Sequence, residues 1–384
     1  MPFWSDGIER TMVMSRFCLG LFGLIFTVTA WAAPSGMTAR AWVSIDQITG
    51  RELAAHQADL PLAPASLTQL MTAYVLLGDI KKNKLSLGEM LSVPQAAEQV
   101  DGARVFLKAG EQISVDTLLQ AMLLQSAGDA TLTLVTAVDG SEAAFVKRMN
   151  SEAKRLGMNK TRFMNATGLT EPGHESSARD LAILGRALVR DFPGRLTFFT
   201  QKELIFKGVT YYNANRLLWR DAAVNGLKVG RTAQAGYCGV ASAQRGDQQR
   251  IAVVLGARTD ALRTQDALKL LNDGFESFDS VRLYRAQQPV KVVKLYRGLS
   301  DSVALGFVQD FHVLIPHGSA ARIKAQVITQ QPVLAPVRKG QRLGTLRLTL
   351  DGKPLGDFAL VALRDVGVSG IFGRAWDSIR LMVE

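Results

Sequence analysis

Residues 64–74 read Pro-Ala-Ser-Leu-Thr-Gln-Leu-Met-Thr-Ala-Tyr, a turn that leads directly into an apolar run. The apolar positions of this run recur at helical spacing and continue to Val75, so the sequence predicts a helix that begins close to Ser66. At a helix N-terminus, the dipole and the free backbone N–H groups favour developing negative charge. Serine is also a favoured capping residue, so this stretch alone fits either a nucleophile or a helix cap.

Two later stretches place further polar residues beside glycines. The first is Ser126-Ala127-Gly128-Asp129-Ala130, which follows Phe106-Leu107-Lys108-Ala109-Gly110-Glu111, and the second is Gly226-Leu227-Lys228-Val229-Gly230-Arg231-Thr232. Between them lie residues 165–169 (Asn-Ala-Thr-Gly-Leu) and 173–180 (Gly-His-Glu-Ser-Ser-Ala-Arg-Asp). Taken singly, Ser126 could be a serine at a helix end and Lys228 an ordinary strand lysine. The order and the spacing of the stretches are what make them informative.

In that order, the three stretches resemble the Ser-x-x-Lys, Ser-x-Asn and Lys-Thr-Gly motifs of the D-alanyl-D-alanine carboxypeptidases, the low-molecular-mass penicillin-binding proteins. The resemblance runs from about residue 38 to the C-terminal segment. It implies an α/β (α+β) domain of the serine-transpeptidase/β-lactamase kind, with helices on both faces of an antiparallel sheet. A small all-β sandwich domain and a C-terminal amphipathic helix would follow. The implied reaction removes terminal D-alanine from peptidoglycan stem peptides through an acyl-serine, without a cofactor or a metal.

The resemblance also assigns roles to individual residues. Ser66 would be the acylated nucleophile, and it would bind β-lactams at the same atom. Ser126 would be a proton relay, and Lys228 an electrostatic partner of the substrate carboxylate. Arg258, in Gly256-Ala257-Arg258-Thr259, resembles a family arginine that faces that carboxylate. Backbone N–H groups of Ser66 and Arg231 would form the oxyanion hole.

The first motif departs from the family at its general base. Gln69 stands where the family has the lysine that accepts the serine proton. The i, i+3 spacing places positions 66 and 69 on one helical face, as this chemistry needs. An amide nitrogen is not basic enough to take a proton near neutral pH, so Gln69 is expected to hydrogen-bond Ser66 without activating it.

The other two motifs depart at substrate-binding positions. Gly128 replaces an asparagine whose amide would contact the substrate peptide, and Val229 replaces a threonine whose hydroxyl would lie near the carboxylate. The sequence therefore predicts a catalytically impaired homologue that binds wall peptides or a partner. The alternative is a slow carboxypeptidase in which Lys228 acts through Ser126, its pKa lowered by burial.

The remaining composition excludes several other functions. The histidines have no metal-ligand spacing with cysteines or carboxylates, and no nucleotide motif is present. No run of Lys and Arg with interleaved aromatics occurs, so nucleic acid is not an expected partner. Once residues 1–32 are removed, Cys238 is the single cysteine, and its apolar surroundings indicate a packing residue.

Hydrophobic periodicity divides the chain at about residue 281. Residues 33–281 read as one mixed α/β domain, with helical patterns at 67–75, 118–123, 145–156 and 181–188 and strand patterns at 41–45, 204–206, 238–243 and 251–255. Residues 282–366 read as a small β domain, because 323–327 and 346–350 alternate strictly and Asp351-Gly352 predicts a hairpin.

The two ends of the chain carry targeting signals. Arg10 and Arg16 precede an apolar run from Phe17 to Ala30, and small residues follow, so residues 1–32 read as a signal peptide. The alternative is an uncleaved N-terminal anchor. Residues 367–384 place apolar side chains on one helical face, which fits either a membrane-interface helix or a helix packed on the β domain. The expected location is the periplasm, with peripheral attachment to the outer face of the inner membrane, and the net charge of +11 would favour anionic lipid or wall polymer.

Overall fold

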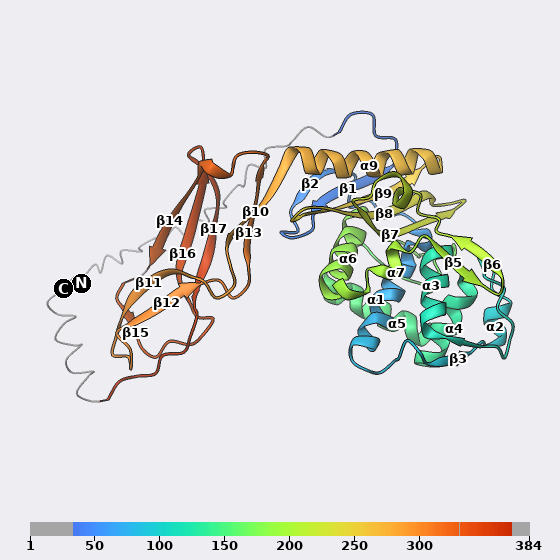
Figure 1. The fold of residues 1–384 in the computed structure, drawn as a ribbon, viewed down its shortest axis with the longest axis horizontal. Coiled ribbons are helices and arrows are strands. Elements are labelled where there is room, and N and C mark those ends of the chain that lie inside the picture. The colour runs from blue at the N-terminus through green and yellow to red at the C-terminus, as the bar shows by residue number, and fades with distance from the viewer. Residues whose placement is uncertain (1–33, 330, 371–384) are drawn as a thin grey trace, which may run out of the picture. The chain divides into compact units, whose positions relative to one another are not determined.

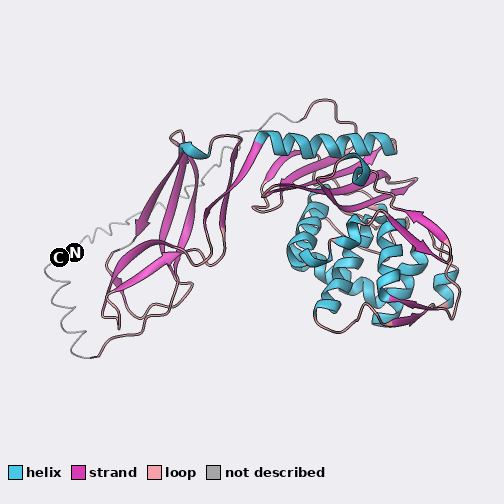
Figure 2. Ribbon diagram, viewed as in Figure 1, coloured by secondary structure: helices cyan, strands magenta, loops and turns pink. Residues whose placement is uncertain are grey.

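The computed structural model describes residues 34–329 and 331–370. The proposed signal peptide, and all but the first four residues of the proposed C-terminal helix, lie outside these ranges. Residues 34–277 mix helices and strands, whereas residues 278–368 consist of strands with a single short 3₁₀ turn (Figure 2). The expected mixed α/β domain followed by a β-rich domain is confirmed. No helix within the described ranges is long and apolar enough to cross a membrane.

A five-stranded antiparallel sheet forms the centre of the first part. Its spatial order is β2 (Glu52–His56), β1 (Ala41–Asp46), β9 (Gln248–Ala257), β8 (Gly236–Arg245) and β7 (Val224–Thr232). Along β9, Ile251, Val253 and Leu255 enter one hydrophobic core, while Ala252 and Val254 enter another. Both faces of this sheet are therefore covered, which explains why β9 reads as a continuous apolar run.

The larger core lies between this sheet and the helices that follow β2. These are the 3₁₀ turn η1 (Ala65–Thr68), α1 (Gln69–Lys81), α3 (Val115–Gln125), α4 (Gly128–Asp139), α5 (Glu142–Leu156) and α6 (Ala178–Asp191), all drawn on one side of the sheet in Figure 1. The helices predicted from periodicity at 67–75, 118–123, 145–156 and 181–188 correspond to η1–α1, α3, α5 and α6. Shorter elements complete this side: α2 (Gln95–Glu98), the hairpins β3 (Met90–Ser92)–β4 (Gln112–Ser114) and β5 (Glu203–Phe206)–β6 (Val209–Tyr212), η2 (Pro193–Arg195) and α7 (Thr197–Thr200).

Helix α9 (Asp260–Ser277) covers the opposite face of the sheet together with α8 (Leu217–Arg220) (Figure 1). Hydrophobic periodicity did not predict α9, because several of its buried positions are polar: Arg263, Thr264 and Asp266. Asp266 accepts hydrogen bonds from the backbone N–H groups of Thr38 and Ala39, both at 3.0 Å. A polar buried face of this kind gives no amphipathic signal in the sequence.

The second part contains a six-stranded sheet in the order β14 (Ile323–Thr329), β16 (Arg342–Leu350), β17 (Lys353–Ala362), β12 (Ser302–Gly306), β11 (Pro289–Tyr296) and β15 (Val333–Leu334). A two-stranded sheet pairs β10 (Phe278–Tyr284) with β13 (Phe311–Pro316), and the short turn η3 (Ala320–Arg322) precedes β14. The segments 323–327 and 346–350, predicted as strands from their alternation, lie in β14 and β16, which pair with each other with Ala325 opposite Leu348. The hairpin between β16 and β17 turns at Asp351 and Gly352, both of which have positive φ.

Candidate active site

Ser66 lies inside η1, where three segments of the chain meet. A Cβ atom at Gly230 of β7 would come within 2.7 Å of the Ser66 backbone nitrogen, and one at Gly168 would come within 2.1 Å of the Ala65 carbonyl oxygen. Ala65 itself adopts φ of 49°, in the left-handed region that side chains usually avoid. The backbone of β7 and the 165–169 loop can therefore approach the serine turn closely only because both positions are glycine.

The serine turn is further held by Thr68 and His174. The Thr68 hydroxyl donates to the Ala65 carbonyl at 2.9 Å and lies 2.8 Å from His174 Nε2. The Met164 N–H donates to His174 Nδ1 at 3.3 Å, so Nε2 carries the ring proton and donates to Thr68. Burial lowers the pKa of His174 to about 4, with a smaller opposing effect of Glu171. The ring is neutral at pH 7, a role that sequence analysis did not assign to it.

Gln69 is fully buried, and its amide does not reach Ser66. Its Nε2 donates to the Ser126 carbonyl and to the Thr131 hydroxyl, each at 3.2 Å. Among the described residues, no hydrogen bond joins the Gln69 side chain to the Ser66 hydroxyl, so the expected side-chain contact is absent from this structure. Gln69 Oε1 is buried without a hydrogen-bond partner. The amide is thus directed to the neighbouring α3–α4 junction, where sequence analysis did not single out Thr131.

Ser126 and Lys228 are brought together across the site. Ser126 is the C-cap of α3, with φ of 59°, and its hydroxyl accepts a hydrogen bond of 2.5 Å from Lys228 Nζ. Lys228 lies on β7 and is only 1% exposed. Burial is the main cause that lowers the pKa of Lys228 to about 7, and the positive charge of Arg263 adds to it. A substantial fraction of this amine is therefore uncharged near neutral pH, and an uncharged amine can accept a proton.

The other predicted site residues flank this pair. Gly128 begins α4, and its N–H donates to the Ala103 carbonyl at 2.7 Å. A Cβ atom at Gly128 would meet Val100 Cγ1 at 3.3 Å, so a larger residue there would have to displace the 99–104 loop slightly. Arg231 is exposed on β7, with its guanidinium 5.1 Å from the centre of the Tyr237 ring.

Arg258, the last of the predicted site residues, lies on a different strand end from Lys228. It is exposed just beyond the end of β9, and within the described ranges no hydrogen bond or ion pair joins it to Lys228. No group of His, Cys, Asp and Glu side chains in those ranges is arranged to hold a metal ion. The side chains gathered around the serine turn thus include two serines and a buried amine, the residue types that nucleophilic acyl transfer uses.

Known families match both parts of the chain. A family described as "D-alanyl-D-alanine carboxypeptidase" matches residues 27–259, and one described as "Penicillin-binding protein 5, C-terminal domain" matches residues 278–368. The D-alanyl-D-alanine carboxypeptidase DacC of Escherichia coli is 39% identical over 94% of this chain and 93% of that protein. DacA of Haemophilus influenzae is 34% identical over 98% of this chain and 96% of that protein.

Solved structures give the same result. Penicillin-binding protein 5 from Haemophilus influenzae superposes with a TM-score of 0.84 at 34% identity, covering 88% of this chain and all of that one. Penicillin-binding protein D2 from Listeria monocytogenes, solved in an ampicillin-bound form, gives a TM-score of 0.58 at 35% identity over 62% of this chain and 98% of that one.

The fold and the family matches place this chain in the penicillin-binding class of proteins. Within that class, this chain belongs to the D-alanyl-D-alanine carboxypeptidase family of peptidoglycan metabolism. The family and the fold class expected from the motifs are therefore confirmed.

Proposed function

We propose that this protein binds the D-alanyl-D-alanine end of peptidoglycan stem peptides at Ser66 and turns it over slowly or not at all. One observation carries the proposal: the position of the general base holds the Gln69 amide, which is buried and donates to Ser126 and Thr131. An amide accepts no proton at neutral pH. Loss of a positioned general base costs about 10²–10⁴ in rate.

In this proposal, two further departures from the family motifs weaken substrate binding. Gly128 offers no side chain to the peptide, and Val229 offers no hydroxyl to the carboxylate. Each would cost about 1–3 kcal/mol of binding if it leaves a substrate polar group unpaired. Arg231 and Arg258 would still present positive charge to the carboxylate, whereas Lys228 would do so only in its protonated form.

A second candidate function rests on the hydrogen bond between Ser126 and Lys228. With a pKa of about 7, the amine is poised to accept a proton relayed from Ser66 through the Ser126 hydroxyl. The protein would then be a slow serine carboxypeptidase whose general base is Lys228 of the third motif, in place of the lysine that the first motif lacks.

Labelling by a fluorescent penicillin tests the main proposal. The unaltered chain should form little acyl-serine, Ser66→Ala should form none, and Gln69→Lys should raise the labelling rate about 10²–10⁴-fold by restoring a base. Gln69→Met, which is similar in size and also lacks a base, is the matched control and should behave as the unaltered chain. Release of D-alanine from a pentapeptide at an ordinary family rate, abolished by Ser66→Ala, would disprove the impairment.

We also propose that the chain is exported to the periplasm and attaches to the inner membrane through residues 367–384. Support comes from the last described residues, where Val368 is 47% exposed and its strand bridge partner Gly298 precedes Leu299, which is 76% exposed. Val368 belongs to the start of this segment, and Leu299 adjoins it through the Gly298 bridge. Membrane fractions of cells that express a chain ending at residue 370 should lose the protein, whereas full-length chain should stay bound.

A further inference from the structure

A cavity that is separate from the Ser66 motifs lies between α6 and the turn that joins β1 to β2. Its volume is about 270 Å³. Ile45, Leu156 and Ile183 form apolar parts of its wall. The charged residues that line it are Arg179, Arg186, Arg190 and Glu52. None of these residues belongs to the three motifs, so the cavity needs an explanation of its own.

The three arginines face the cavity because of their spacing on α6. Positions 179, 186 and 190 are seven and four residues apart, which places them along one helical face. Between them, Ala182 and Ala187 carry only methyl groups, and both also line the cavity. The small alanines leave the space that the longer arginines border.

Two of the arginines are already neutralised by carboxylates. Arg179 pairs with Asp59 at 2.8 Å and also with Glu52. Arg190 forms a two-pronged pair with Asp191, at 2.7 and 2.9 Å. These cations bring little uncompensated charge to the cavity.

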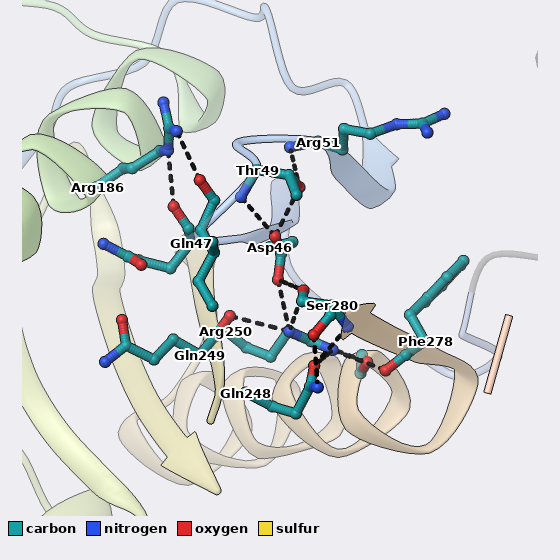
Figure 3. A network of polar contacts seen from close by, with 12 residues as sticks. Asp46, Gln47, Thr49, Arg51, Arg186, Gln248, Gln249, Arg250, Phe278 and Ser280 are labelled. Carbon is teal, nitrogen blue, oxygen red and sulfur yellow. Dashed lines mark hydrogen bonds and ion pairs between the residues drawn. The ribbon is translucent and has the colours of Figure 1, made fainter. Parts of the chain in front are cut away.

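Arg186 differs from both, because carbonyl oxygens are its hydrogen-bond partners. Its Nε donates to the Gln47 carbonyl at 2.7 Å and its Nη2 to the Ile48 carbonyl at 2.9 Å (Figure 3). Within the described ranges, no carboxylate lies at ion-pair distance from it. The Nη1 group keeps both of its hydrogens for another acceptor. Burial lowers the pKa of Arg186, and the charge of Arg190 lowers it further.

The nearby carboxylate of Asp46 is committed elsewhere. It accepts from Arg250 Nη1 at 2.6 Å, from the Thr49 N–H at 2.7 Å and hydroxyl at 2.6 Å, and from the Ser280 hydroxyl (Figure 3). Asp46 and Arg250 are both fully buried, so this charge pair compensates itself. Arg186 is thus left without a carboxylate at ion-pair distance within the described ranges, and the more distant Asp46 charge only partly opposes the lowering of its pKa.

Gly50 keeps the guanidinium of Arg186 uncovered. A Cβ atom there would lie 2.8 Å from Arg186 Cζ and 2.9 Å from Nη1, and Gly50 also lines the cavity. Its φ of 73° is in the region that glycine adopts freely. A side chain at this turn would therefore occupy the space beside the free edge of the cation.

We propose that this cavity binds a small organic anion, with its carboxylate or phosphate on Arg186 and its apolar part against Ile45, Leu156 and Ile183. A planar guanidinium with free N–H donors suits either oxyanion. A site with a mostly apolar wall and one fixed polar group orients a ligand that has one polar end. The proposal is independent of turnover at Ser66.

Calorimetric titration of the full-length chain with simple probes tests the site. Acetate, butyrate and hexanoate share one carboxylate, and each methylene buried against the wall should tighten binding up to about fourfold. Butyl phosphate, which carries a phosphate on a similar apolar tail, distinguishes a phosphate ligand from a carboxylate ligand. Butylammonium has the same apolar tail with the opposite charge and should not bind.

Single substitutions test whether butyrate binds in this cavity. Arg186→Gln should weaken butyrate binding at least tenfold, and Ile183→Trp should do the same by filling the cavity while it leaves the carbonyl contacts of Arg186 intact. Arg285→Gln, at an exposed position outside the cavity, is the matched control. Arg258→Gln should leave binding unchanged, which separates this cavity from the Ser66 site. Butyrate binding that survives both cavity variants, or no binding of any anionic probe at millimolar concentration, would overturn the proposal.

Discussion

At the scale of single residues, Lys228 decides whether any chemistry remains. Its side chain is a buried amine, and its Nζ donates a hydrogen bond of 2.5 Å to the Ser126 hydroxyl, the group proposed to relay a proton from Ser66. Its pKa is lowered mainly by desolvation, and no carboxylate contacts the amine to raise the pKa again. The same burial that makes it a usable base also removes its value as a fixed positive charge.

Residual labelling of the unaltered chain should therefore depend on pH if Lys228 is the base. Below pH 7 the amine is protonated, so the rate should rise about tenfold per pH unit up to about pH 7 and level off above it. Penicillin labelling between pH 5.5 and 8.5 measures the profile. Lys228→Arg stays protonated throughout and gives the background. A flat profile in the unaltered chain would exclude Lys228 as the base.

His174 should make the fold sensitive to mild acid. Its pKa of about 4 in the folded state lies below the ordinary value of about 6.5 in the unfolded chain, so protons favour unfolding in this interval. The stability it supports is complete above pH 6.5 and is lost as the pH falls toward 4, by about 3 kcal/mol. Urea unfolding of the unaltered chain at pH 7 and pH 4.5 measures the loss.

His174→Gln is the comparison for this prediction, since glutamine offers a donor without a titration in this range. The variant should be less stable than the unaltered chain at pH 7 and should lose less on acidification. An equal loss in both chains would assign the acid sensitivity to other groups, such as buried carboxylates.

At the scale of elements, close backbone approach around η1 shapes the site. Glycines at 168 and 230 let a loop and a strand touch the serine turn, whereas the serine itself adds no side-chain cap to α1. The position of Ser66 is thus set by the 165–169 loop and by β7, which pack against the start of the helix, more than by the helix itself.

Gly168→Ala should consequently destabilise the protein, by about 2–4 kcal/mol, because it combines a positive φ of 88° with a contact of 2.1 Å to the Ala65 carbonyl. Gly78→Ala is the matched control within α1. No atom lies within 4 Å of a Cβ at that position, so alanine should stabilise the helix by about 0.5–1 kcal/mol. Denaturant unfolding of both variants checks the pair; equal effects would contradict the crowding argument.

At the scale of the whole molecule, the buried pair of Asp46 and Arg250 ties distant segments together. Arg250 on β9 reaches Asp46 on β1, and it also donates to the Phe278 carbonyl at 2.7 Å, where β10 begins (Figure 3). Its guanidinium lies 5.2 Å from the centre of the Phe275 ring of α9. The guanidinium of Arg250 on β9 thus contacts residues of β1, β10 and α9.

Arg250→Met should cost about 3–5 kcal/mol of unfolding free energy, because it strands the Asp46 carboxylate without its charge partner. The surface pair between Arg347 and Asp357, at 2.7 Å, is the control, and Arg347→Met should change stability little. Urea titrations at low and high salt measure both. A small effect of Arg250→Met would mean that Asp46 becomes protonated or solvated at low cost.

The sequence by itself determined the family and the strand alternation in the β region, and it predicts the loss of the base at Gln69. These depend on local patterns: motif order, a period of two or 3.6 residues, and the identity of one side chain. The serine turn and the hairpin at Asp351 and Gly352 are present as expected for the same reason.

Only the tertiary structure decided where the polar groups point and how they are charged. The Gln69 amide turns to Ser126 and Thr131, the pKa of Lys228 falls to about 7, α9 buries polar residues, and Arg186 remains without a carboxylate. Each outcome depends on neighbours that lie tens to hundreds of residues away and on how far water is excluded. Desolvation and long-range contacts are properties of the folded arrangement, so no local pattern encodes them in readable form.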